Sequence, residues 1–186
     1  MIIFMKTLRI LWIPFIVLLL DQITKFTVKF TMDLHQSIPI LGNFFKLTYV
    51  ENPGMAFGIS FGNNVFFSVF ALVASIAILI YLFKMKSEHP FARFAMAIIF
   101  GGAIGNLTDR FIRGSVIDFL DFNFFNINIP AFKFLFLDFP GYSLSRWPVF
   151  NVADMAVTIG MIILFIFILT EKEKTEPEDT ETEMVR

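Results

Sequence analysis

Residues 65–83 read VFFSVFALVASIAILIYLF and contain no charged side chain. A helix needs about 20 apolar residues to cross a hydrocarbon core of roughly 30 Å, and this stretch has that length. Three other stretches are comparable, and we expect all four to cross a membrane as helices. The predicted spans are 8–30, 65–83, 91–112 and 152–169. The expected fold class is therefore mainly α and integral to the membrane, a bundle of four transmembrane helices.

The composition supports a membrane protein. Of the 186 residues 56% are hydrophobic and 27 are Phe, whereas a soluble domain is usually about 45–50% apolar. Residues 171–186 differ, because they hold seven acidic and three basic side chains. We expect one membrane domain over residues 1–170, followed by a disordered acidic tail over 171–186.

The first span is the least regular of the four. Its apolar segment Ile10–Leu20 follows Lys6 and Arg9, as the apolar region of a signal peptide follows basic residues. No small-x-small cleavage site comes next, since the chain continues with DQITK at residues 21–25. We therefore expect this segment to be retained as a membrane helix.

Basic residues predict the orientation, since short cytoplasmic loops carry an excess of Lys and Arg. Bases precede the first span, flank the connection between the second and third, and follow the fourth. The 31–63 loop holds only Lys46, although the 113–150 loop holds three bases. On balance both termini are expected in the cytoplasm.

Polar side chains within the spans fall at one level of this arrangement. Spans one and three end at the outer face, and spans two and four begin there. The polar residues at those ends are Asp21, Lys25, Asn106, Asp109, Arg110 and Asp154. Ionisable groups at membrane depth are costly and normally face a bundle interior or a wet cavity. We expect a single polar site near the outer surface.

The chain limits the chemistry that such a site can perform. It has no cysteine, which excludes a thiol nucleophile and thiolate-bound metals, and both histidines, His35 and His89, lie outside the spans. Residues 58–62, GISFG, match the nucleophile elbow of serine hydrolases. That motif requires a strand–turn–helix context and a histidine base, and we interpret the match as a loop.

Asp118 and Asp154 are the candidate catalytic pair. Asp118 follows the third span and Asp154 begins the fourth, so antiparallel neighbouring helices would bring them together. Plainer interpretations exist for each: a loop carboxylate for Asp118, and the third position of a helix capped by Asn151 for Asp154. Two carboxylates in one site share a proton. Such a pair can hydrolyse a peptide bond without a metal, one Asp activating water and the other assisting the carbonyl and the leaving amine.

Other polar residues have two interpretations that both stay open. Asp21 and Lys25 are one helical turn apart and can form an ion pair, either as a structural pair or to position a substrate. Residues 44–50 are β-like, and the Pro53-Gly54 sequence that follows is typical of a turn. The Asn52 side chain before it can both donate and accept hydrogen bonds.

Five sequence blocks, in their order and spacing, resemble the signature blocks of bacterial lipoprotein signal peptidases (signal peptidase II). They are DQITK (21–25), NPGMAFG (52–58), GGAIGNLTDR (101–110), VIDF (116–119) and FNVAD (150–154). The resemblance covers about residues 8–170. It implies a membrane aspartic endopeptidase that removes the signal peptide from diacylglyceryl-modified prolipoproteins, cutting before the lipidated cysteine. It also implies the bacterial inner membrane, with the active site near the outer leaflet.

The resemblance assigns roles to residues of this chain. It implies that Asp118 and Asp154 are catalytic. The substrate-binding and supporting residues that it implies are Asp21, Lys25, Asn52, Gly54, Asn106, Arg110 and Asn151. A small extracytoplasmic β-like cradle is expected over about residues 36–60, with no metal or organic cofactor. The expected partners are lipidated prolipoprotein signal peptides and membrane lipids, without nucleic acid, and the protein is expected to be a monomer.

Two features depart from this pattern, the acidic tail and the long aromatic connection over residues 122–149. Because this connection is longer than the pattern, the resemblance does not indicate how the loop folds or how it controls entry of the substrate. Asp121 is a rival for the role of Asp118, which we prefer because it lies in the VIDF block. Two other classes of function remain: a proton-coupled carrier, which would distribute polar residues through the bilayer, and a non-catalytic scaffold, which would not need Asp118.

Overall fold

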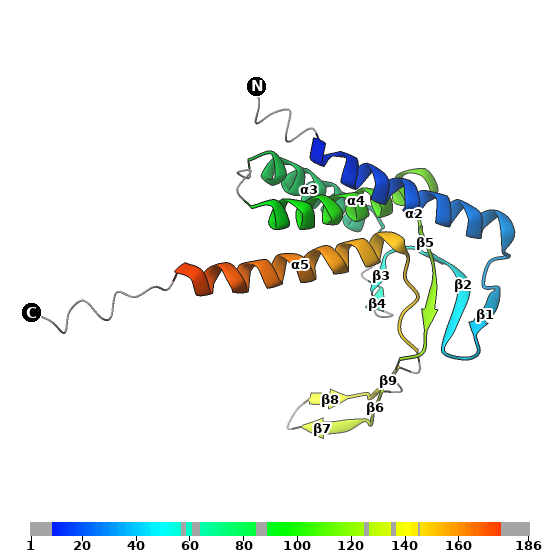
Figure 1. Ribbon diagram of the computed structural model, residues 1–186. Coiled ribbons are helices and arrows are strands. Elements are labelled where there is room, and N and C mark those ends of the chain that lie inside the picture. Colours follow the sequence, from blue (N-terminus) through cyan, green and yellow to red (C-terminus); the bar gives the residue numbers. More distant parts are fainter. Residues whose placement is uncertain are drawn as a thin grey trace, which may run out of the picture.

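Helices dominate the part of the chain that the structure describes, and a small sheet lies at one end of them (Figure 1). The structure is a computed structural model that describes residues 9–56, 59–60, 64–84, 89–124, 127–134, 137–144 and 146–175. The long helices in these ranges are α2 (Trp12–Thr31), α3 (Asn64–Lys84), α4 (Pro90–Arg113) and α5 (Val152–Thr175). Each overlaps one predicted span.

The helices differ in how well they suit a membrane. Among the described residues, Pro90–Arg113 and Val152–Glu171 are long and apolar enough to cross one, and Ser68–Lys84 is a shorter apolar helix. Helix α2 carries Asp21, Lys25 and Lys29, which lower its mean hydropathy. The mainly helical fold with a small sheet is confirmed, and the number of spans stays a prediction.

Helix α5 is longer than its predicted span. It continues to Thr175, so the first five residues of the predicted disordered tail are helical. The residues of this extension include Glu and Lys, which favour helices. The rest of the tail lies outside the described residues.

Close packing of α4 brings α2 and α5 together around it. A Cβ atom at Gly102 would collide with the carbonyl oxygen of Ala153, and one at Gly105 would lie 2.5 Å from the Asp21 carboxylate. Small residues permit this close approach of helix backbones, as is usual between membrane helices. The polar ends of α2, α4 and α5 therefore meet.

The sheet is built from two separate parts of the chain. Strands β1 (Ser37–Leu41) and β2 (Phe45–Asn52) come from the predicted cradle, and β5 (Val116–Phe122) follows α4. All neighbours are antiparallel, in the order β1-β2-β5. A shorter ladder joins β3 (Met55–Ala56) to β4 (Ile59–Ser60). The cradle prediction over residues 36–60 is thus incomplete, because β5 is a third strand of the main sheet.

Two features determine the position of β5. Its pairing with β2 is irregular between Leu47 and Val50, after which Val50 lies opposite Asp118. Such bulges bend a strand and redirect its side chains, often beside active sites. A hydrophobic cluster of Val28, Met32, Tyr49, Ile117 and Phe119 also packs the end of α2 against β2 and β5.

The long connection between β5 and α5 forms two further antiparallel ladders. Strand β6 (Ile127–Ile129) pairs with β9 (Tyr142–Leu144), and β7 (Phe132–Phe134) pairs with β8 (Leu137–Phe139). We call these four strands the arm. In Figure 1 the arm, in yellow, leaves the end of β5 and stands apart from the helices and the main sheet.

Candidate active site

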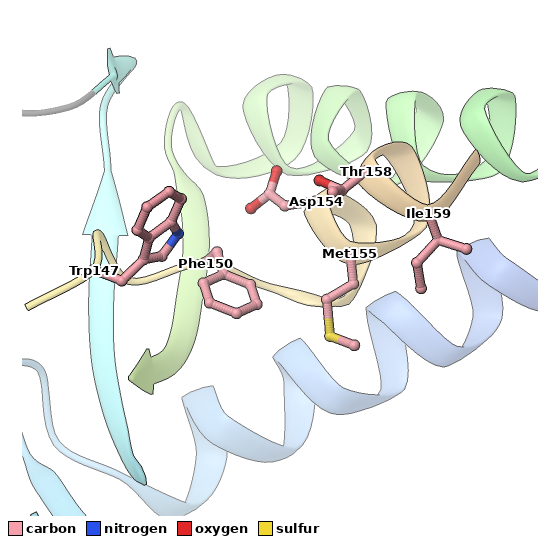
Figure 2. Close-up of a pocket in the computed structure, with 6 residues that line it drawn as sticks. All are labelled: Trp147, Phe150, Asp154, Met155, Thr158 and Ile159. Atoms are coloured by element: carbon pink, nitrogen blue, oxygen red, sulfur yellow. The ribbon is translucent and has the colours of Figure 1, made fainter. Parts of the chain in front are cut away.

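Asp118 and Asp154 reach the same region from different elements. Asp118 lies in the middle of β5 and is only 3% exposed, whereas Asp154 lies in the first turn of α5 and is partly exposed. Figure 2 shows the Asp154 side chain extending from the start of α5 toward strand β5. The structure therefore brings together the two carboxylates that the sequence selected.

Asn151 connects the two aspartates. Its side-chain amide donates to Asp118 at 2.6 Å, and its backbone N–H donates to the Asp154 carboxylate at 3.1 Å. Its side-chain oxygen accepts from the backbone N–H of Asp154 at 3.0 Å. The last two bonds form a reciprocal helix cap, so the plainer interpretation of Asn151 and Asp154 holds alongside the proximity to Asp118.

The turn after β2 supplies another donor to Asp118. The Asn52 side-chain amide donates to the Asp118 carboxylate at 3.1 Å, while its oxygen accepts from the backbone N–H of Gly54 at 2.9 Å. Gly54 has a φ of 112°, a conformation that glycine adopts most readily. The predicted turn therefore orients Asn52 toward the pair.

Asn106 supports the pair from α4. Its amide donates to Asp154 at 2.7 Å, and its oxygen accepts from the Asn151 amide at 3.0 Å and from the Lys25 ammonium at 2.9 Å. One N–H and both lone pairs of this amide side chain are thus engaged by neighbours. Because Asn106 cannot rotate without losing these bonds, it holds Asp154 in a fixed position.

A buried charge cluster lies behind these amides. Lys25 forms ion pairs of 2.9 Å with both Asp21 and Asp109, and all three side chains are fully buried. Arg113 forms a further ion pair with Asp109, and the Gln22 amide donates to both aspartates at 3.1 Å. The predicted Asp21–Lys25 pair is confirmed, with Asp109 as its third member.

This cluster also holds the backbone beside each candidate catalytic residue. The Asp21 carboxylate accepts from the N–H of Ala153, which precedes Asp154, at 2.9 Å. The Asp109 carboxylate accepts from the N–H of Ile117, which precedes Asp118, at 3.1 Å. The buried Asp109 carboxylate therefore ties α4 to β5.

Electrostatics distinguish Asp118 from an ordinary carboxyl. Burial and the neighbouring Asp154 carboxylate raise the pKa of Asp118 from 3.8 to about 7, against the hydrogen bonds from Asn52 and Asn151. The Arg110 guanidinium on α4 attracts the carboxylates of both Asp154 and Asp118. A pair that retains a proton near neutral pH can donate and accept protons in one reaction.

A pocket of about 270 Å³ adjoins Asp154 (Figure 2). Its lining is otherwise mostly apolar: Trp147, Phe150, Met155, Thr158 and Ile159. The pocket can hold an apolar segment of a ligand with one carboxylate beside it. This combination suits a reaction on a polar bond within an otherwise hydrophobic substrate.

Asp121 serves a different purpose from Asp118. Residues three apart on a strand point to opposite faces, and the Asp121 carboxylate accepts from Arg146 Nε at 2.6 Å and from the Thr48 hydroxyl at 2.7 Å. Arg146 also donates to the backbone oxygen of Asn43 at 3.0 Å. Asp121 thus ties the end of the long connection to the sheet.

Some site features were not predicted. Gln22 and Arg113 were not selected from the sequence, although Gln22 lies within the DQITK block and only the fold gives it partners on α4. The GISFG match lies partly outside the described residues. Within the described part of the chain, no group of three or more His, Cys, Asp or Glu side chains is arranged to hold a metal ion.

Comparison with known proteins gives a consistent result. A family model described as signal peptidase (SPase) II matches residues 13–170. The lipoprotein signal peptidase of Desulforapulum autotrophicum is 37% identical over 88% of this chain and 93% of its own. That of Moorella thermoacetica is 39% identical over 83% of this chain and 88% of its own. A solved structure of a bacterial membrane enzyme superposes with a TM-score of 0.72 at 30% identity, covering 92% of this chain and 93% of that chain.

Proposed function

The chain belongs to the signal peptidase II family of membrane peptidases, and we propose that it removes the signal peptide from diacylglyceryl-modified prolipoproteins. Cleavage occurs before the lipidated cysteine, which becomes the new N-terminus. The observation that carries this proposal is the Asn151 side chain hydrogen-bonded between the elements that bear Asp118 and Asp154. It supports an aspartic mechanism, because one residue donates to both carboxylates, through its side chain to Asp118 and through its backbone N–H to Asp154.

In the proposed reaction the two aspartates share one proton. The ionised carboxylate takes a proton from water as the water oxygen attacks the scissile carbonyl carbon, and the protonated one donates a hydrogen bond to the carbonyl oxygen. The resulting tetrahedral intermediate, whose oxyanion accepts that hydrogen bond, then collapses. Its C–N bond breaks, and a carboxyl proton passes to the leaving amine. No metal or covalent intermediate takes part, and the pair ends with the proton count with which it began.

The surrounding residues have two proposed roles. Asn52, Gly54 and Arg110 border the carboxylates and bind the substrate backbone beside the scissile bond. Asn106 and the cluster around Lys25 act through the aspartates and position them. The hydrogen bonds from Asn106 to Asp154 and from Lys25 to Asn106 support this second role.

The apolar pocket supports a lipid-anchored substrate. Its mostly hydrophobic lining adjoins Asp154, so a signal peptide within the bilayer can place its cleavage site at the pair without leaving the membrane. We propose that all four helices span the bacterial inner membrane, that both termini are cytoplasmic, and that the aspartates lie near the outer leaflet. The protein is proposed to act as a monomer.

A carrier is supported less well by the same observations. The buried ionisable side chains of α2 around Asp21 and Lys25 are all bonded to partners at the sheet end of the helices. A carrier would need polar groups along a path through the bilayer. The concentration of these α2 side chains at one end favours a reaction site.

The direct test uses the full-length protein in liposomes with a prolipoprotein that carries the diacylglyceryl group. We expect a shift in size on a gel, and mass spectrometry of the product should identify the lipidated cysteine as its first residue. A precursor of the same sequence without the lipid is the matched control and should remain uncut. Equal cleavage of both precursors, or cleavage of neither by folded protein, would contradict the proposal.

A further inference from the structure

The arm has two chemically different faces. On β7 and β8, Phe132 lies opposite Phe139 and their rings are 5.0 Å apart, while the next residues, Lys133 and Asp138, form an ion pair of 3.1 Å. Neighbouring residues of a strand point to opposite faces. One face of this hairpin is therefore aromatic, and the other carries a charge pair that adds no net charge.

The aromatic face is uncovered by the rest of the described chain. Phe132 is 51% exposed and Phe139 is 39% exposed. The substantial contacts of each arm strand are with its own partner strand. A two-stranded hairpin is marginally stable in water unless a hydrophobic face packs on something, so the arm needs a surface on which to rest.

The base of the arm is firmly held, which sets its direction. Trp147 N–H donates to the Phe122 oxygen at 3.0 Å, the rings of Phe122 and Phe124 stack at 5.1 Å, and Arg146 pairs with Asp121. In Figure 1 the arm leaves the end of β5, and β7–β8 points in the direction in which α5 runs. The arm therefore turns back toward the side of the sheet occupied by the helices.

We propose that the arm rests on the membrane surface next to the sheet and inserts the Phe132 and Phe139 side chains among the lipids of that leaflet. Amphipathic elements with Phe on one face and charges on the other bind at the headgroup and acyl boundary. Helix α5, which runs in the same direction as β7–β8, also exposes apolar side chains to the surroundings, among them Ile162, Phe165 and Ile166. This part of the inference rests on the proposed function: with both termini in the cytoplasm, the leaflet next to the sheet is the outer one.

Backbone hydrogen bonding limits how deeply the arm can enter. Each two-stranded ladder leaves its outer N–H and C=O groups unpaired, and such groups are not tolerated within the hydrocarbon region. Only the aromatic side chains reach the acyl chains. The backbone and the Lys133–Asp138 face remain among the headgroups and water.

Spin labelling can test this placement directly, because the chain contains no cysteine and needs none removed. Full-length Phe132→Cys and its neighbour on the opposite face, Lys133→Cys, are labelled with a nitroxide in vesicles of phosphatidylethanolamine and phosphatidylglycerol. Power saturation then measures collision with oxygen, which concentrates in lipid, and with a water-soluble nickel chelate. Labels at Ile162→Cys in α5 and Asn43→Cys in the exposed β1–β2 turn are the lipid and water references.

We expect the oxygen-to-nickel accessibility ratio at residue 132 to be several-fold higher than at residue 133 and close to that at 162. Phe139→Cys should repeat the result if the first variant perturbs the hairpin. A ratio at both aromatic positions equal to that at residue 43 would overturn the proposal. Exclusion of both reagents would also overturn it, since protein rather than lipid would then cover the face. No substrate is present, so the result is independent of peptidase activity.

Discussion

The side-chain amide of Asn151 donates a hydrogen bond of 2.6 Å to the carboxylate of Asp118. Asn151 stands immediately before α5, and Asp118 lies in β5, so this bond joins the helix that bears Asp154 to the strand opposite it. The same residue caps α5 through its exchange of bonds with Asp154. Removing it should therefore affect both stability and catalysis.

Asn151→Ala and Asn151→Ser separate these two effects. A serine hydroxyl can still cap the helix, but it cannot replace the amide that also donates to Asp118. Alanine can do neither. We expect Ala to lower the free energy of unfolding by about 1 kcal/mol and Ser to restore most of it. Turnover of the lipidated precursor should fall on the order of 10²-fold in both, because the carboxylates lose their alignment. Asn43→Ala, at the β1–β2 turn, is the control. Recovery of turnover by Ser would reduce Asn151 to a structural cap.

The pKa of Asp118 predicts two dependences on pH. A carboxyl whose pKa rises from 3.8 to about 7 on folding binds its proton more tightly in the folded state. The free energy of unfolding should therefore fall as pH rises from about 4 to about 7, and Asp118→Asn should remove that contribution.

The turnover number should decline by about tenfold per pH unit above about pH 7, as the pair loses its shared proton. A turnover number that stays constant from pH 7 to pH 9 would contradict this assignment.

The buried charge cluster predicts a large difference between two lysines on the same helix. Lys25→Met leaves the buried carboxylates of Asp21 and Asp109 without their shared cation, which should cost about 3–5 kcal/mol. Lys29→Met removes a partly exposed pair with Glu51 at 3.5 Å, where solvent screening limits the loss to about 0–1 kcal/mol. Denaturant unfolding in detergent measures both. Equal losses would show that the buried cluster is not required for stability.

Local sequence patterns predicted the helices well. The spans expected at 65–83 and 91–112 correspond to α3 (Asn64–Lys84) and α4 (Pro90–Arg113) within one residue at each end. Long apolar runs specify membrane helices because each backbone bond is made within the run. The same reasoning placed Asp118 and Asp154 at one level, and the antiparallel packing of α4 and α5 brought them together.

Strand β5 could not be predicted in the same way. Its residues are nearly all buried on both faces, so the alternation that marks a half-buried strand is absent. Its pairing with β2 joins residues more than sixty positions apart, and the irregularity between Leu47 and Val50 has no local signal. The same holds for Asp109, whose bond to the Ile117 N–H depends on how α4 meets β5. Long-range contacts decided these features.

The most direct test of the account compares wild type with Asp118→Asn, Asp154→Asn and Asp121→Asn on the lipidated precursor in liposomes. Asp121→Asn is the matched control, because it is on the same strand but bonds to Arg146 and Thr48. We expect no cleavage by the first two variants at wild-type levels of folded protein, and cleavage by the third. Retained turnover in Asp118→Asn or Asp154→Asn would remove that residue from the catalytic pair and contradict the mechanism.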